Sequence, residues 1–253
     1  MTSIPNTATP AAEASPYATT PSAVTQTRPR RAGRPTDLTR RDWMIPAALV
    51  VLSIIPVLAG GLRLGELAGG AEVTADNARF VANPLPLVVH IVSASVFCVV
   101  GAFQFSPGLR RRHRRWHRVA GRALVPLGLI SGGSGIWLTL AYPFVEPDGW
   151  ILYGMRLVVG SAMVASIGLA IRAILRRQFT SHGAWMIRGY ALGLGAGTQV
   201  LTLLIWILIG GPETELGRVI VMGSGWAINM IVAEWAIQRM SRSPGAQVSM
   251  RPA

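Results

Sequence analysis

The apolar residues of this chain occur in long continuous runs, and not in the short alternating patterns of soluble helices and strands. A helix needs roughly 20 predominantly apolar residues to cross the hydrocarbon core of a membrane. Six windows reach that length, at about residues 43–62, 85–105, 120–142, 150–174, 184–209 and 219–238. Each is expected to be helical, because an open strand would leave backbone groups unpaired in lipid. The pattern predicts an all-α fold, a polytopic transmembrane bundle of six spans.

Composition supports this class and divides the chain. Of the 253 residues, 51% are hydrophobic and 14% charged, with a mean hydropathy of +0.42, whereas soluble domains carry roughly a quarter charged residues. Residues 1–41 are rich in Thr, Ala, Pro and Ser and lack apolar periodicity, which is typical of disorder. They also lack the apolar core of a secretory signal peptide. We therefore expect a disordered tail over 1–41, a membrane domain over 42–240 and a second tail over 241–253.

Charge is distributed unevenly between the connections. The net charge is +13, and every basic residue is an arginine. Arginines cluster in segments 30–41, 110–118, 176–177 and 239–251, whereas the intervening segments 66–76, 146–148 and 213–215 carry acidic residues. Positively charged connections stay cytoplasmic, so both termini are predicted to be cytoplasmic, in the inner (plasma) membrane of a bacterium.

The segment RRRHRRWHR at 110–118 mixes arginine with an aromatic residue, as nucleic-acid-binding segments do. In a membrane protein such a segment also sets topology and contacts anionic lipid headgroups, at about 1 kcal/mol per residue. We expect the bilayer and its anionic headgroups as partners, and no nucleic acid.

Motifs of soluble enzymes are absent from the sequence, which has no P-loop, no H-E-x-x-H and no G-x-S-x-G nucleophile elbow. The single cysteine excludes an intramolecular disulfide. Glycines recur at a spacing of four in two spans, at Gly128 and Gly132 and at Gly189, Gly193 and Gly197. Small residues at this spacing let helices pack closely, and they also make room for a flat cofactor.

Polar residues within or beside the spans are the candidates for function, because ionisable groups are costly in a membrane. With the orientation above, they fall into two layers. The cytoplasmic layer comprises Gln104, His117, Arg122, His182, Arg188 and Glu234. The outer layer comprises His90, Arg156 and Gln199, with Asn229 near the middle of the last span.

Three separated motifs carry a family resemblance: His90 through GAFQFSPGLRRRHRRWHRVAGR, HGAWMIRGYAL at 182–192 and NMIVAEW at 229–235. Over about residues 43–240 the chain resembles a bacterial family of predicted membrane proteins, domain of unknown function 2306. The resemblance implies a polytopic bundle and no particular activity. Its signature positions would be His90, Gln104, His117, Arg118, Gly121, Arg122, His182, Trp185, Met186, Arg188 and Glu234.

Haem b binding on the cytoplasmic side is the most specific functional hypothesis. His117 and His182 begin the third and fifth spans and would serve as axial ligands to the haem iron. Arg122 and Arg188 would pair with the propionates. Both histidines lie at span starts, and His90 has no histidine partner in its own layer, which weakens the hypothesis. If the protein is an enzyme, it would be a membrane oxidoreductase.

Two alternatives remain. In a proton relay or small-solute transporter, His90, Arg156 and Gln199 would form an outer cluster, and Glu234 would join the two cytoplasmic histidines. The broken half-helices common in transporters are not expected from the sequence. In a scaffold or accessory protein the same residues are structural: Glu234 pairs with Arg188 or Arg122, and Arg156 snorkels outward.

Overall fold

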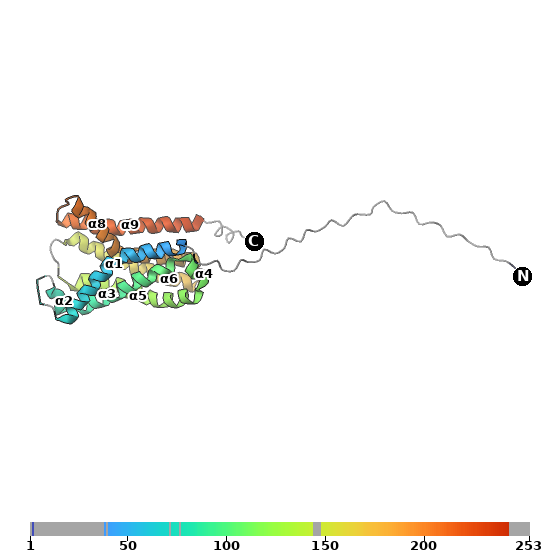
Figure 1. Ribbon diagram of the computed structural model, residues 1–253, viewed down its shortest axis with the longest axis horizontal. Helices are drawn as coiled ribbons and strands as arrows, with labels where there is room; N and C mark the ends of the chain where they lie inside the picture. Colours follow the sequence, from blue (N-terminus) through green and yellow to red (C-terminus); the bar gives the residue numbers. More distant parts are fainter. Residues whose placement is uncertain are drawn as a thin grey trace. The chain divides into compact units, whose positions relative to one another are not determined.

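The computed structural model describes residues 40–70, 72–75, 77–143 and 148–242, with isolated positions 2 and 38. These residues contain helices and no strand, which confirms the all-α class (Figure 1). Most of the predicted tail over 1–41 and most of the tail over 241–253 lie outside the described residues. In chain order the elements are α1 (Arg40–Gly69), α2 (Ala78–Ala82), α3 (Leu85–Ala102), the 3-10 turn η1 (Phe103–Phe105), α4 (Pro107–Arg112), α5 (Arg114–Ala141), α6 (Trp150–Leu175), α7 (Phe179–Gly193), α8 (Gly195–Leu208) and α9 (Glu215–Arg242).

Five described helices are long and apolar enough to cross a membrane: α1, α3 with η1, α5, α6 and α9. A sixth span is completed only when α7 and α8 are taken together. The expectation of one continuous helix over 184–209 is wrong, because these two helices meet at an angle of 46°. The polytopic bundle is confirmed, with five or six spans, and one of them is a broken span of the kind that the sequence did not lead us to expect.

Glycines account for the position of the break. Gly193 and Gly195 flank Leu194, and Gly197 follows two residues after Gly195. Each glycine lowers helix stability by about 1 kcal/mol relative to alanine. Two of them also permit close packing. A side chain at Gly195 would meet the indole of Trp226, and one at Gly197 would meet the backbone carbonyl of Leu52 in α1. The glycine run thus weakens the helix and lets α1 and α9 approach the bend.

The backbone at the break is held by side chains of neighbouring helices. Asn229 of α9 donates from Nδ2 to the carbonyl oxygen of Ala191 at 3.0 Å. The Cys98 thiol of α3 donates to the carbonyl oxygen of Gly193 at 3.5 Å. The Thr198 hydroxyl donates to Oδ1 of Asn229 at 2.6 Å. Because a membrane interior offers little water, such contacts are what makes a broken helix tolerable there.

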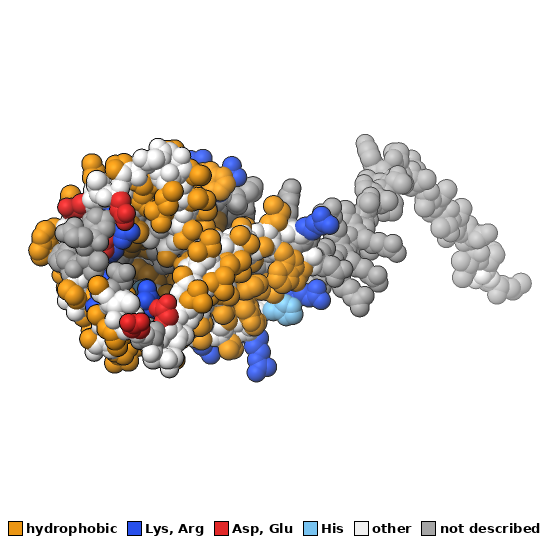
Figure 2. Space-filling model, turned by 60° about the vertical axis from the view of Figure 1, so that its left-hand side comes forward, with side chains coloured by type: hydrophobic (Ala, Val, Ile, Leu, Met, Phe, Trp, Pro, Cys, Tyr) orange, Lys and Arg blue, Asp and Glu red, His pale blue; other side chains and the backbone are white. Residues whose placement is uncertain are grey.

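The core lies where α3, α5, α6 and α7 meet, and α1 packs against α3 and α8 while α9 packs against α7 and α8. Its buried cluster consists of Phe97, Cys98, Ala102, Leu124, Met163, Ile167, Tyr190, Leu192 and Leu194. On the flanks, large apolar side chains such as Leu62, Val158 and Ile231 are exposed, and they cover much of the face in Figure 2. An apolar exterior of this kind suits contact with lipid.

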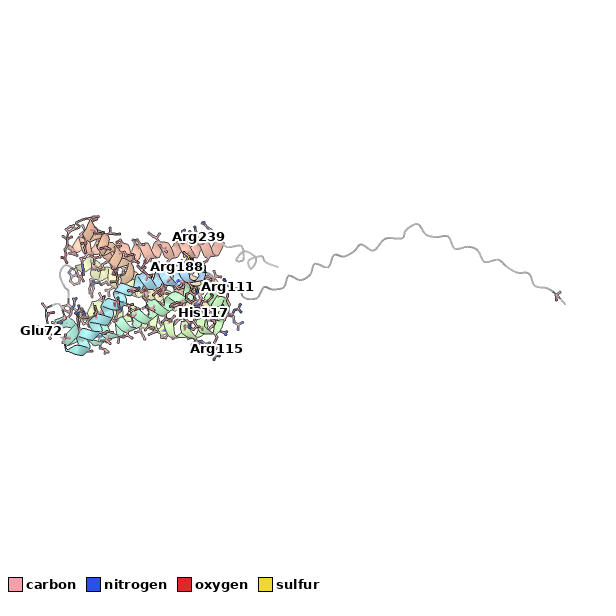
Figure 3. The ribbon with its side chains drawn as sticks, in the orientation of Figure 1. Glu72, Arg111, Arg115, His117, Arg188 and Arg239 are labelled. Carbon is pink, nitrogen blue, oxygen red and sulfur yellow. The ribbon has the colours of Figure 1, made fainter. Side chains whose placement is uncertain are left out.

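The two ends of the bundle differ in charge. Figure 3 shows Glu72 at one end and Arg111, Arg115 and Arg239 at the other. We call the end with Glu72 the outer end and the opposite one the inner end. Which end faces the cytoplasm is still a prediction.

Candidate functional site

A cavity of about 560 Å³ occupies the outer half of the bundle. At the outer end it is lined by Arg79, Tyr142 and Asp148, and it reaches the α7–α8 break at Gly193 and Leu194. Figure 2, in which the outer end has come forward, shows basic side chains between acidic ones there. The volume lies in the range of roughly 300–1,000 Å³ that is usual for small-molecule sites.

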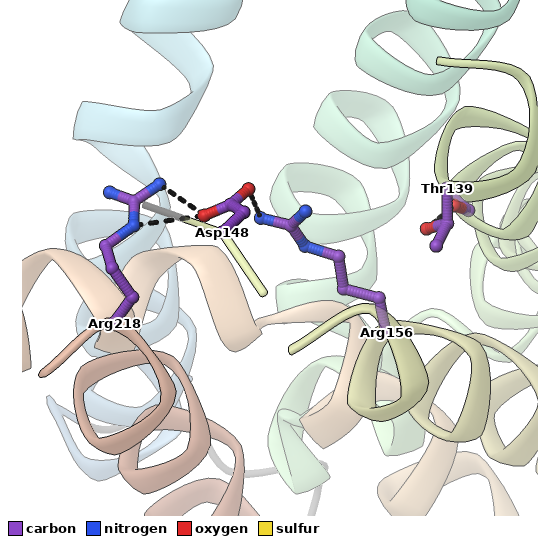
Figure 4. A network of polar contacts seen from close by, with 5 residues as sticks. Thr139, Asp148, Arg156 and Arg218 are labelled. Carbon is purple, nitrogen blue, oxygen red and sulfur yellow. Dashed lines mark hydrogen bonds and ion pairs between the residues drawn. The ribbon is translucent and has the colours of Figure 1, made fainter. Parts of the chain in front are cut away.

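Asp148 bridges two arginines at the mouth of this cavity (Figure 4). Its Oδ2 accepts a hydrogen bond from Arg156 of α6 at 2.8 Å. Its Oδ1 accepts from Nε and Nη2 of Arg218 of α9, at 3.1 and 3.0 Å. Burial opposes ionisation of this carboxyl, but the two ion pairs outweigh it and hold the pKa of Asp148 below its usual range. One carboxylate therefore joins α6 to α9.

Arg79 of α2 is a third arginine in the cavity lining. Its guanidinium stacks over the Phe80 ring at 4.6 Å, and its Nε is buried with no hydrogen-bond partner among the described residues. The charged lining residues described are Arg79, Arg156, Arg218 and Asp148. The described residues at the mouth therefore carry an excess of positive charge, together with a donor that none of the described groups satisfies.

His90 of α3 lies deeper in the cavity lining. Its Nδ1 is 3.1 Å from the carbonyl oxygen of Ser131 and 3.1 Å from the hydroxyl of Ser134, both in α5. Since the Ser134 hydroxyl itself donates to Ser131, the simplest assignment has Nδ1–H donating to this pair. Nε2 is then left as the acceptor nitrogen of a neutral imidazole.

The rest of the lining is mostly apolar, and the walls between mouth and break include Ile91, Leu138, Val159, Met163, Leu192 and Trp226. Gln199 is a polar lining residue near the break, and its Nε2 donates to the carbonyl oxygen of Met222 at 3.1 Å. His90, Arg156 and Gln199, the three residues of the predicted outer layer, thus line one cavity. The side chain of Arg156 does not extend freely into solvent, as snorkelling would require, but bonds to the carboxylate of Asp148.

At the inner end, Arg188 of α7 forms a two-point ion pair with Glu234 of α9. Nε of Arg188 donates to Oε1 of Glu234 at 2.6 Å, and Nη2 donates to Oε2 at 2.9 Å. The Arg188 guanidinium also lies over the Trp185 ring at 4.6 Å. The pair joins the first half of the broken span to the last helix. Arg122 is exposed on α5, and no contact between it and Glu234 is found among the described residues.

The two inner histidines are in different situations. Nδ1 of His182 is 3.0 Å from the carbonyl oxygen of Ala170 in α6. Nδ1 of His117 is buried without a hydrogen-bond partner in the described part of the chain, as are both amide atoms of Gln104. The two imidazoles are near enough to interact electrostatically. Buried polar atoms without hydrogen-bond partners are costly and therefore rare, so this region is a second candidate site.

Haem fits these inner residues only in part. The backbone bond of His182 leaves its Nε2 available, which is the usual arrangement of a metal-binding histidine. Arg188, however, is already paired with Glu234. The glycine faces give no slot for a porphyrin, because a side chain at Gly128 or Gly193 would meet Phe97. Among the described residues, no three His, Cys, Asp or Glu side chains are grouped so as to hold a metal ion.

The sequence did not single out the mouth of the cavity. Arg79 and Arg218 were not among the candidates, and Asp148 was interpreted only as part of an acidic connection. Both arginines are positive residues next to outer segments that are otherwise acidic. That departure from the charge pattern was the available signal.

Comparisons with known proteins agree with this fold. The family model described as "Predicted membrane protein (DUF2306)" matches residues 87–237, more than half of the chain and all helices from α3 to most of α9. No curated protein and no solved structure matches the chain significantly. The chain therefore belongs to the DUF2306 family of predicted membrane proteins.

Proposed function

We propose that this membrane protein binds a small solute in its outer cavity and transports it. One observation carries the proposal: the cavity extends from charged residues at the outer end to a broken helix inside the bundle. Transporters commonly place their sites at such breaks, because an interrupted helix supplies polar groups within the membrane. A protein with purely structural motifs would not need a ligand-sized cavity there.

The positive-inside rule supports an orientation for this activity. The inner end carries the arginines of α4 and of the start of α5, so we place it in the cytoplasm, together with both termini. The cavity would then open to the periplasmic side of a bacterial inner membrane.

Uptake into proteoliposomes tests the proposal. The probe is radiolabelled 1-octanesulfonate, because its permanent charge slows passive crossing of the lipid. We expect uptake above protein-free liposomes, and a strong reduction in Ala94→Phe, which places a bulky side chain in the cavity lining. Ala48→Phe is the matched control, since Ala48 is exposed on α1 outside the lining. Uptake equal to that of empty liposomes would refute transport.

A cytoplasmic-side haem b is the second candidate. It is favoured by Nδ1 of His117, which lies near His182 and has no hydrogen-bond partner among the described residues. The haem would lie between the starts of α5 and α7, away from the filled glycine faces. The visible spectrum of protein purified from haem-replete cells decides the matter. A Soret band lost in both His117→Ala and His182→Ala supports haem, and a colourless preparation excludes it.

A further inference from the structure

We infer that the outer cavity selects an amphiphile with one acidic head group. Three arginines, Arg79, Arg156 and Arg218, would hold this head group at the mouth. The inference rests on the proposed binding function of this cavity and adds the chemical class of the solute. It uses three arginines and one carboxylate, none of them on the same helix.

Charge at the mouth favours an anion. Arg79, Arg156 and Arg218 face a single carboxylate, Asp148, in the described lining. Asp148 offsets only one of these three positive charges, and guanidinium charge in excess of its counter-ions is costly next to a membrane interior. An acidic head group would supply the missing charge and would accept from Nε of Arg79, which no described group satisfies.

The remainder of the cavity favours an apolar body. Below the mouth, the walls are formed by side chains such as Ile91, Leu138, Val159 and Met163. Removal of apolar surface from water favours binding of an apolar group to such walls. A small inorganic anion would leave these walls without a partner, whereas an alkyl chain attached to the head group would cover them.

Asp148 acts as an internal competitor in this arrangement. It occupies both Arg156 and Arg218 with hydrogen bonds of 2.8 to 3.1 Å. An incoming acid has to share these donors with Asp148 or replace it. The carboxylate therefore offsets one of the two arginine charges when the cavity is empty, and it weakens binding of the acid.

Binding of three eight-carbon probes to the full-length protein in nanodiscs tests the inference. The probes are 1-octanesulfonate, 1-octanol and octyltrimethylammonium, measured by calorimetry against empty nanodiscs. We expect the sulfonate to bind at least about tenfold more tightly than the alcohol, a difference of about 1.4 kcal/mol, because hydrogen bonds between charged groups are stronger than those to a neutral hydroxyl. The ammonium probe should bind most weakly.

Three variants locate the effect. Arg79→Gln should lower sulfonate affinity about tenfold and leave octanol binding unchanged. Asp148→Asn should raise sulfonate affinity, because it keeps the shape and removes the competing charge. Arg172→Gln is the matched control: Arg172 is exposed in the last turn of α6, outside the cavity lining, so it should change affinity less than about threefold. Melting curves confirm that each variant is folded.

The outcomes separate this inference from the proposed transport. Sulfonate and octanol of equal affinity, both lost in Ala94→Phe, would leave the cavity as the site and overturn the acidic class. Weaker sulfonate binding in Asp148→Asn would also overturn it. Selective sulfonate binding without uptake into proteoliposomes would support the class and refute transport alone.

Discussion

Asn229 should be the most sensitive polar residue in the membrane interior, because it holds the α7–α8 break. It is buried on α9, donates to Ala191 at 3.0 Å and accepts from Thr198 at 2.6 Å. Hydrogen bonds between membrane helices contribute about 0.6 kcal/mol on average and up to about 1.7. Loss of both in Asn229→Ala should therefore lower the free energy of unfolding by roughly 1–3 kcal/mol.

A double-mutant cycle measures this contribution. Asn229→Ala, Thr198→Val and their combination are unfolded with SDS in mixed micelles, and tryptophan fluorescence follows the transition. The two residues should show a coupling energy of about 0.6–1.7 kcal/mol. Thr202→Val is the control, because Thr202 also joins α8 to α9 through Val221 but lies away from the break. A coupling energy of zero, or an Asn229→Ala cost no larger than that of Thr202→Val, would refute this role.

Three further results are expected. Gly197→Ala should destabilise the protein by about 1–3 kcal/mol, because its side chain would meet the Leu52 carbonyl, whereas Gly133→Ala, with open space around it, should cost little in the same unfolding assay. The pKa of folded Asp148 lies below its usual range, so ionised Asp148 stabilises the folded protein above about pH 4, and this stabilisation is lost as the pH falls through the folded pKa. The difference in melting temperature between wild type and Asp148→Asn should therefore shrink on acidification. A difference that stays constant with pH would contradict this. Arg188→Ala and Glu234→Ala should each lower the melting temperature, and the double variant should lower it by less than the sum; additive effects would show that the pair of α7 and α9 does not act as a unit.

The sequence was sufficient for the elements that depend on local composition. Continuous apolar runs predicted the spans, because a membrane helix must be apolar over its whole length. The break at Leu194 was missed, since glycines in a membrane helix are as typical of close packing as of interruption. What distinguishes the two is the long-range partner Asn229, whose bond to Ala191 is not visible in a local pattern.

The sequence predicted some residues of the candidate site and missed others, for a similar reason. His90 and Arg156 stood out because polar residues are rare within spans. Asp148 and Arg218 lie 70 positions apart, and each is ordinary in its own segment. Only the packing of α6 against α9 shows that one carboxylate serves two arginines.

Labelling of a cysteine in the cavity would test most directly whether the outer cavity is a solute site open to the periplasm. Thr139→Cys, in the cavity lining, is made in a Cys98→Ser background, and Ile231→Cys, on the exposed apolar flank well inside α9, is the control. Both are exposed in spheroplasts to a membrane-impermeant sulfonated thiol reagent. We expect the cysteine at 139 to be labelled from outside and 1-octanesulfonate to slow that labelling, with the control unreactive. No labelling from outside, or a rate that 1-octanesulfonate leaves unchanged, would contradict a solute site open to that side.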